Sequence, residues 1–116
     1  MAENERVICP SAALEEGGAG VRFQVEEGGR NVPAFVVRHA GLPRAYVNRC
    51  AHVGVELDWQ EGQFFDADTG LLMCATHGAL YDPASGECRG GPCRGGRLAP
   101  VAVVERDGRI LLIEKN

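Results

Sequence analysis

The sequence predicts an all-β protein built from short antiparallel strands. Apolar residues recur with period two over short stretches, which is the pattern of half-buried strands. The 16 glycines favour turns, because glycine weakens helices and allows positive φ. Turn sequences such as Asp-Gly join consecutive apolar runs. We expect one domain over residues 1–116, with at most one helical turn, over residues 12–16, because 116 residues with 45% hydrophobic content suffice for a single modest core.

The first half of the chain contains three predicted strands. Residues 21–25 (Val-Arg-Phe-Gln-Val) alternate between apolar and polar side chains, which is typical of a strand with one buried face. A Glu-Gly-Gly-Arg turn at 27–30 separates it from a second strand at 32–38. Gly-Leu-Pro at 41–43 is the next turn, and residues 44–49 form the third strand.

Two hairpins are predicted in the second half. Residues 64–66 and 71–73 flank Asp-Thr-Gly, in which Gly70 supplies a left-handed conformation. Residues 101–105 and 109–113 are joined by Arg-Asp-Gly. Asp-Gly between apolar runs is a strong hairpin signal, because both residues tolerate positive φ.

The charge and the N-terminus limit the partners. A net charge of −4 and a pI near 5.3 argue against nucleic acid, whose phosphates require a basic face. Mild acidity would suit docking to a basic patch on another protein. It is also an ordinary feature of soluble proteins, and we favour this second interpretation. Residues 1–10 lack a signal-peptide pattern and no apolar run is long enough for a membrane span. We therefore expect a cytoplasmic protein without a membrane anchor.

Cysteine and histidine carry the chemical signal. Five cysteines without a secretory signal are a poor disulfide framework and a better indication of metal binding. Two segments that each follow a predicted strand contain one cysteine and one histidine, in the pattern C-x-H-x(21)-C-x-x-H. The four candidate ligands are Cys50, His52, Cys74 and His77.

Two kinds of metal site accept this donor set. Zinc binds Cys₂His₂, but zinc fingers pair cysteine with cysteine and histidine with histidine at spacings that this chain lacks. In a Rieske centre, two thiolates hold one iron of a [2Fe–2S] cluster and two imidazoles hold the other. Two loops that each supply one cysteine and one histidine favour the second interpretation.

The pattern resembles the Rieske signature, and its surroundings agree. Gly54 and Gly78 follow the two histidines, residues 81–86 (Tyr-Asp-Pro-Ala-Ser-Gly) resemble the family's turn after the second loop, and residues 90–92 (Gly-Gly-Pro) resemble its third, proline-containing loop. The resemblance implies a Rieske-type antiparallel β-sandwich with a small inserted cluster-binding subdomain. It also implies one [2Fe–2S] cluster, with one iron held by two cysteines and the other by two histidines: Cys50, Cys74, His52 and His77.

Departures from the signature refine the resemblance. Val55 and Thr76 stand where Rieske subunits of respiratory complexes have an additional pair of cysteines, and Ala79 replaces a serine whose hydroxyl bonds to a bridging sulfide. Tyr81 occupies a position from which a hydroxyl can reach a ligand sulfur. Fewer hydrogen bonds to the cluster imply a potential at the lower end of the Rieske range of roughly −150 to +300 mV. The chain is most similar to Rieske ferredoxins of bacterial aromatic-ring dioxygenase systems.

This resemblance implies an electron-transfer protein, not an enzyme with a substrate. Its expected partners are a flavin-dependent ferredoxin reductase and a terminal oxygenase. The alternative is a small Rieske-like subunit of a larger reductase of the nitrite-reductase type. A catalytic oxygenase is excluded for this chain alone, because its mononuclear iron needs two further histidines and only His39 remains.

The other candidate residues have structural interpretations. Cys88 and Cys93 flank the proline loop, and we expect free thiols there, with a disulfide or a second metal site as alternatives; Cys9 is expected to be an ordinary thiol. The arginines of the proline loop are expected on a solvated face, with docking or redox tuning as the alternative; they are Arg89, Arg94 and Arg97.

Acidic and aromatic residues lie near the first loop. Glu56 and Asp58 are expected on a solvated face, with an acidic docking rim as the alternative. Trp59, Phe64 and Phe65 are expected in the core between the two cysteine loops, with an electron relay as the alternative.

Overall fold

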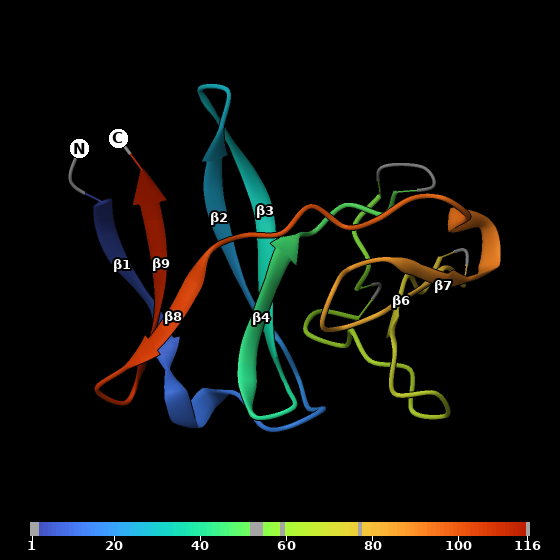
Figure 1. The fold of residues 1–116 in the computed structure, drawn as a ribbon, viewed down its shortest axis with the longest axis horizontal. Coiled ribbons are helices and arrows are strands. Elements are labelled where there is room, and N and C mark those ends of the chain that lie inside the picture. The colour runs from blue at the N-terminus through green and yellow to red at the C-terminus, as the bar shows by residue number, and fades with distance from the viewer. Residues whose placement is uncertain (1–2, 52–54, 59, 77, 116) are drawn as a thin grey trace.

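The computed structural model describes residues 3–51, 55–58, 60–76 and 78–115. These residues form three antiparallel sheets of three strands each, in three successive layers (Figure 1). The prediction of an all-β fold is confirmed. In sheet order, the strands are β1 (Glu3–Pro10), β9 (Arg109–Lys115) and β8 (Val103–Arg106); β2 (Val21–Glu27), β3 (Arg30–His39) and β4 (Leu42–Val47); and β5 (Leu72–Met73), β6 (Leu80–Tyr81) and β7 (Cys88–Gly90).

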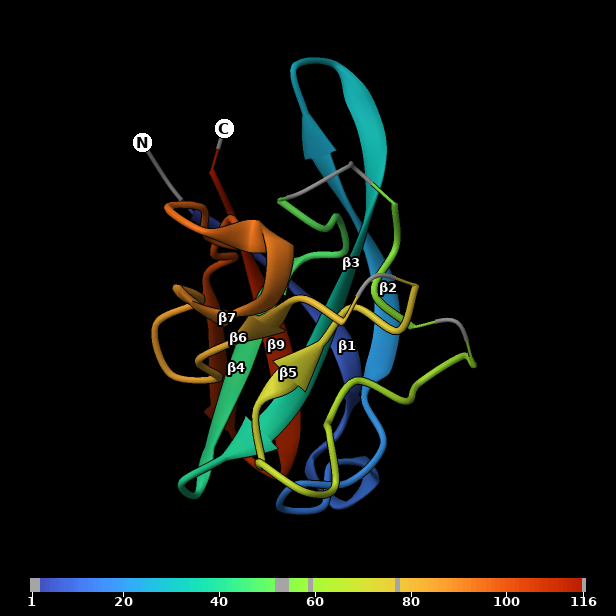
Figure 2. The same ribbon diagram turned by 90° about the vertical axis from the view of Figure 1, so that its right-hand side faces the viewer.

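We call the first two sheets the base. We call the described part of residues 50–98 the small lobe; it contains the third sheet. The base has long strands, whereas the strands of the small lobe span only two or three residues. Figure 2 looks onto the small lobe, which lies at one end of the molecule. Backbone bonds from Val47 N to Ala99 O and from Val101 N to Ala45 O, both 2.9 Å, join β4 to the segment that leads into β8.

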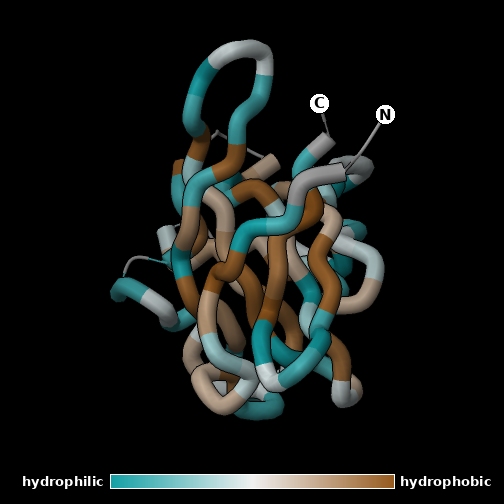
Figure 3. Tube along the Cα trace, turned by 90° about the vertical axis from the view of Figure 1, so that its left-hand side faces the viewer, coloured by the Kyte–Doolittle hydropathy of each residue, from teal (hydrophilic) through white to brown (hydrophobic). Residues whose placement is uncertain are grey.

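Strand β3 lies at the centre of the fold because both of its faces are covered. Residues 34–37 (Ala-Phe-Val-Val) are fully buried. Val36 packs into the core of the base with Cys9 and Ile110. Phe35 and Val37 face the small lobe, where Phe35 stacks on Phe64 with ring centroids 4.0 Å apart. Apolar residues occupy the middle of the strands, while the β2–β3 hairpin tip is hydrophilic (Figure 3).

The predicted hairpins are confirmed at their turns. Asp107 and Gly108 have φ of 55° and 73° between β8 and β9. Gly70 has φ of 73° and donates its N–H to Asp66 O at 2.8 Å, and Phe65 pairs with Leu72. The helical turn expected over residues 12–16 lies earlier, as the 3₁₀ turn η1 (Ser11–Ala13). A second 3₁₀ turn, η2 (Gly91–Cys93), was not predicted.

Three strands were not predicted from sequence. β1 lies at the edge of its sheet and pairs with β9 at the opposite end of the chain, from Glu3–Lys115 to Pro10–Arg109. β6 and β7 are too short to produce a periodic pattern. The strand predicted at residues 64–66 is reduced to an isolated bridge between Phe65 and Leu72. The other predicted strands are present with shifted ends; for example, β4 begins at Leu42 and ends at Val47, not at Arg49. Within the described residues, no helix has the length and apolar character needed to cross a membrane.

Candidate metal centre

Two loops of the small lobe begin at cysteines and close in the same way. The amide N of Cys50 donates to Val55 O at 2.6 Å, and the amide N of Cys74 donates to Ala79 O at 2.8 Å. Each bond joins a cysteine to the residue five positions later. Gly78 has φ of 74° and donates its own N–H to Cys74 O, which turns the second chain back tightly.

Both cysteines are buried between these loops. The exposed fraction is 1% for Cys50 and 0% for Cys74, and both belong to one apolar cluster. The structure therefore places both predicted sulfur ligands in the interior of the small lobe. The two predicted imidazole ligands, His52 and His77, lie outside the described residues, as does Gly54.

A buried polar network ties the first loop to the base and to the second loop. Asn48 is 1% exposed; its side-chain oxygen accepts from Leu57 N at 2.8 Å, and its side-chain nitrogen donates to Asp58 Oδ1 at 2.9 Å. Leu57 O in turn accepts from Ala75 N at 3.0 Å, next to Cys74. This chain of bonds fixes the relative position of the two cysteine loops.

The expectation of a solvated Asp58 is wrong. Its carboxylate is buried, with Oδ2 accepting from Gly62 N at 2.9 Å and lying 3.6 Å from Nε of Arg22. These donors compensate the loss of water, which makes burial of a charged group tolerable. Glu56 is exposed, as expected, and forms an ion pair with the same Arg22.

Tyr81 contacts the first cysteine directly. Its hydroxyl lies 3.2 Å from Cys50 Sγ, and its oxygen accepts from Ala51 N at 3.0 Å. A cysteine that ligates a metal is a thiolate without a proton, so in that state the Tyr81 hydroxyl is the donor of this hydrogen bond. Burial and the hydrogen bond with Cys50 raise the pKa of Tyr81 above its ordinary value, so the hydroxyl keeps this proton. The hydroxyl of Tyr81 therefore reaches the sulfur of Cys50, which is one of the predicted ligands.

The proline-containing loop, residues 88–97, packs against both cysteine loops. A Cβ at Gly91 would lie 2.7 Å from Gly78 O, and a Cβ at Gly96 would lie 2.9 Å from the Ala51 side chain. Only glycine permits such close approach at these two positions. Glycine at both positions therefore allows the proline loop to lie directly against the two cysteine loops.

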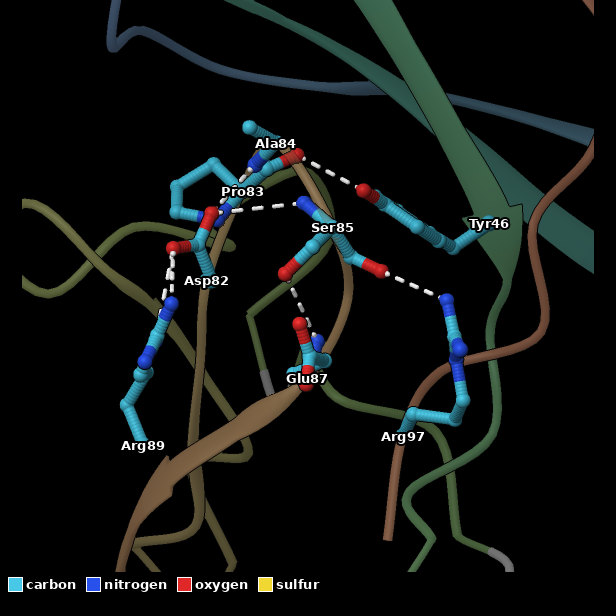
Figure 4. A network of polar contacts seen from close by, with 8 residues as sticks. All are labelled: Tyr46, Asp82, Pro83, Ala84, Ser85, Glu87, Arg89 and Arg97. Atoms are coloured by element: carbon cyan, nitrogen blue, oxygen red, sulfur yellow. Dashed lines mark hydrogen bonds and ion pairs between the residues drawn. The ribbon is translucent and has the colours of Figure 1, made fainter.

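The turn before this loop is fixed by polar contacts (Figure 4). Asp82 Oδ1 accepts from Ala84 N at 2.7 Å, and its Oδ2 forms an ion pair with Arg89 at 3.0 Å. The buried hydroxyl of Tyr46 donates to Pro83 O at 2.7 Å. These contacts connect the turn to strand β4 of the base.

The expectation of free thiols at Cys88 and Cys93 is wrong. The two residues form a disulfide, with Cα atoms 5.7 Å apart. The 3₁₀ turn η2 brings the chain back on itself and sets this separation, which lies in the usual range for disulfides. The disulfide closes the first part of the proline loop, residues 88–93, into a ring.

The remaining predicted residues mostly have the expected structural roles. Phe64 is buried and Phe65 packs against the same cluster; Trp59 lies outside the described residues. His39 ends β3 and is partly buried. Cys9 is buried in the base, where burial raises the pKa of its thiol.

The residues present fit an iron–sulfur cluster. Two buried cysteines begin two equivalent loops, and a hydroxyl donor reaches one of the sulfurs. Thiolates are the ligands that such clusters require. Within the described part of the chain, no group of three or more histidine, cysteine, aspartate or glutamate side chains forms another metal-binding cluster.

Comparison with known proteins agrees with this geometry. The family model of the Rieske [2Fe-2S] domain matches residues 4–110. The chain belongs to this family, whose members carry one Rieske-type [2Fe–2S] cluster, and its fold is the Rieske fold. A search of the curated proteins found no match.

Solved structures with the same fold include two ferredoxins. The ferredoxin of carbazole 1,9a-dioxygenase from Nocardioides aromaticivorans IC177 is 22% identical, with a TM-score of 0.72 over 97% of this chain and 99% of that one. The Sphingomonas yanoikuyae B1 ferredoxin is 23% identical, with a TM-score of 0.69 over 97% and 100%. A third match, at 20% identity and a TM-score of 0.70 over 97% and 96%, comes from a complex of reduced oxygenase and oxidized ferredoxin in carbazole 1,9a-dioxygenase.

Proposed function

We propose that this chain is a single Rieske domain that acts as a one-electron carrier, and that Cys50, His52, Cys74 and His77 hold its cluster. The observation that carries the proposal is the pair of buried cysteines at equivalent places in two loops closed by the same backbone bond. The histidines complete the pattern two and three residues after these cysteines.

The cluster, when bound, supplies one reversible electron. Cys50 and Cys74 provide anionic sulfur away from water. Tyr81 donates to Cys50 Sγ and so stabilises negative charge there. The Asn48–Leu57–Ala75 bonds hold the two loops in register, so little reorganisation is needed when charge changes.

The similarity of fold to ferredoxins supports the proposed partners. We propose that the chain takes electrons from a flavin-dependent ferredoxin reductase and passes them to a terminal oxygenase in the cytoplasm. A similar fold occurs in a ferredoxin that forms a complex with its oxygenase. In this function the chain transfers electrons and converts no substrate of its own.

The first test is the EPR spectrum of the dithionite-reduced protein, with iron and sulfide analysis. We expect a rhombic signal with an average g below that of all-cysteine clusters, and two irons and two sulfides per chain. An EPR-silent protein that contains zinc would contradict the proposal.

Substitution of the ligands gives the second test. Cys74→Ser should abolish the Rieske signal and lower iron content by more than about tenfold, because a neutral hydroxyl replaces a thiolate at an interior site. Cys9→Ser is the matched control, since Cys9 is also buried but lies in the base. Retention of the native signal by Cys74→Ser would refute the ligand assignment.

A further inference from the structure

The proline loop gives the small lobe a charged edge of sign opposite to the whole chain. Residues 88–98 contain three arginines and no acidic residue, although the net charge of the chain is −4. The three side chains are exposed; they belong to Arg89, Arg94 and Arg97. Local charge near a redox centre affects encounter with a partner more than net charge does.

Two of these charges form no ion pair among the described residues, although the backbone of the exposed Glu87 pairs with that of Arg97. Arg89 forms an ion pair with Asp82. Arg97 donates to a neutral acceptor, Ser85 O, at 3.2 Å (Figure 4). Among the described residues, neither Arg94 nor Arg97 forms an ion pair with an acidic side chain. Their positive charge is therefore presented to solvent.

The loop holds these arginines rigidly beside the cysteine loops. The disulfide joins Cys88 to Cys93, and Gly96 forms backbone hydrogen bonds with both cysteines. Cys88 N donates to Gly96 O at 3.0 Å, and Gly96 N donates to Cys93 O at 2.7 Å. Arg97 also lines a surface hollow of about 340 Å³ together with Cys50 and Arg49. A rigid loop loses little conformational entropy when a partner docks.

The opposite edge of the small lobe is acidic. Residues 56–68 contain five carboxylates and no lysine or arginine; they are Glu56, Asp58, Glu61, Asp66 and Asp68. In Figure 2, the proline loop (orange) lies at the upper left, and the segment around residue 60 (yellow-green) lies at the right. Arg22, from β2, pairs with Glu56 and Asp58 and offsets part of this acidic charge. The lobe that carries the cysteines is therefore dipolar.

We infer that the arginine edge, residues 89–97, is a docking surface for a protein partner whose electron-exchange site is bordered by carboxylates. This inference rests on the proposed electron-carrier function and deepens it. The arginine edge attracts the acidic border of the partner, and the acidic edge at 56–68 fixes the orientation by repulsion. The net charge of −4 would instead favour docking of an acidic surface to a basic partner. The arginine edge has the opposite sign, so that expectation does not describe it.

Small redox ions test the local sign of charge at the cluster. The reduced protein is mixed with the trianion hexacyanoferrate(III), which accepts one electron to become hexacyanoferrate(II) while the cluster is oxidised. At about 0.01 M ionic strength, where the Debye length is ~30 Å, we expect this reaction to slow as salt is added, because the arginine edge attracts the trianion. A net charge of −4 acting alone predicts the opposite salt dependence.

Arg94→Glu and the control Arg109→Glu change the net charge equally. Arg109 is exposed at the β8–β9 turn of the base, far from the small lobe in Figure 1. At about 0.1 M ionic strength, where the Debye length is only ~10 Å, Arg94→Glu should slow oxidation by the trianion at least about threefold and accelerate oxidation by the trication hexaammineruthenium(III). Arg109→Glu should change either rate less than about 1.5-fold. Equal effects of the two variants would overturn the inference.

Poly-L-glutamate serves as the probe for an acidic protein surface. It should slow oxidation of the native protein by hexacyanoferrate, and Arg94→Glu should raise the concentration for half-inhibition at least about threefold. Equal inhibition of both proteins would overturn the inference. The EPR signal separates the two proposals: a protein without a reducible cluster refutes the electron-carrier function, whereas an intact signal with no preference for acidic probes refutes only the docking surface.

Discussion

The base and the small lobe are stabilised in different ways. In the base, strands of four to ten residues form long ladders, and the apolar faces of two sheets meet. In the small lobe, strands of two or three residues provide few ladder bonds. Its loops are held instead by a disulfide, buried polar side chains and single backbone bonds. Such cross-links define the shape of a loop-rich site that its small core cannot define.

This difference shows how the fold separates stability from function. The apolar cluster that contains Phe35 and Val37 anchors the small lobe on one face of β3. The base therefore supplies a rigid support, while the loops carry the residues that vary with function. Disruption of a cross-link in the small lobe should loosen the cluster loops without unfolding the base.

The largest effect on stability is expected at Asn48. Asn48→Ala removes the acceptor for Leu57 N and a donor to Asp58, and leaves both groups buried. We expect the free energy of unfolding to fall by about 3 kcal/mol, measured by denaturant titration. Amide exchange at Leu57 and Ala75 should accelerate more than exchange in β3.

Asn31→Ala is the control for this variant, because Asn31 is an exposed asparagine of β3. It should change the free energy of unfolding by less than about 0.5 kcal/mol. If both variants have equal effects, the polar network does not stabilise the small lobe.

Removal of the disulfide should have the next largest effect. The double variant Cys88→Ser, Cys93→Ser opens a six-residue loop, which lowers the free energy of unfolding by about 2 kcal/mol in the loop-entropy treatment. Native protein reduced with dithiothreitol should show the same loss, whereas the double variant should not respond to dithiothreitol. A native protein that loses no stability on reduction would contradict this account.

The contrast between the two regions also explains what the sequence alone could predict. The hairpin at Asp107–Gly108 and the strand at residues 32–38 were predictable because local turn chemistry and apolar pattern determine them. Strand β1 was not, because it depends on pairing with β9 at the other end of the chain. Edge strands also expose polar residues and so lack a clear pattern.

Within the candidate site, the cysteine and histidine spacing was predictable from chemistry, and the contacts around it were not. Asp58 is buried because Asn48, ten residues earlier, is folded against it. Cys88 and Cys93 are joined because η2 reverses the chain between them. Neither arrangement has a periodic or compositional signal, since both depend on the three-dimensional course of loops.

A variant of Tyr81 tests whether its hydroxyl affects the reduction potential of the cluster or only packs in the core. Tyr81→Phe removes the hydrogen bond to Cys50 Sγ, which stabilises the more negative, reduced state. We expect the reduction potential to fall by about 50 mV, corresponding to about 1 kcal/mol for one electron, in a redox titration followed by EPR.

Tyr46→Phe is the matched control. Its buried hydroxyl donates to Pro83 O at 2.7 Å. It should cost about 1 kcal/mol of stability and leave the potential unchanged. A similar shift of potential in both variants would mean that general loosening of the small lobe, and not the sulfur hydrogen bond, sets the potential.

The smallest expected effect is in the base and depends on pH. Arg38 forms two hydrogen bonds with Glu105, at 2.8 and 2.9 Å, which join β3 to β8. These bonds lower the pKa of Glu105 from 4.5 to about 2. Because the pKa is lower in the folded protein, the pair stabilises the fold above pH 4.5, and this contribution is lost as pH falls toward 2.

Glu105→Gln tests this pH dependence. The variant should be less stable than the native protein at pH 7, by less than about 1 kcal/mol because the pair is partly exposed. The difference should shrink between pH 4.5 and pH 2, measured by thermal unfolding across that range. Since Arg38 and Glu105 lie in the base, the iron content should be equal in the two proteins at pH 7. A stability difference that stays constant with pH would show that the ion pair does not link the two sheets. A lower iron content in the variant would show that the base and the small lobe are not independent.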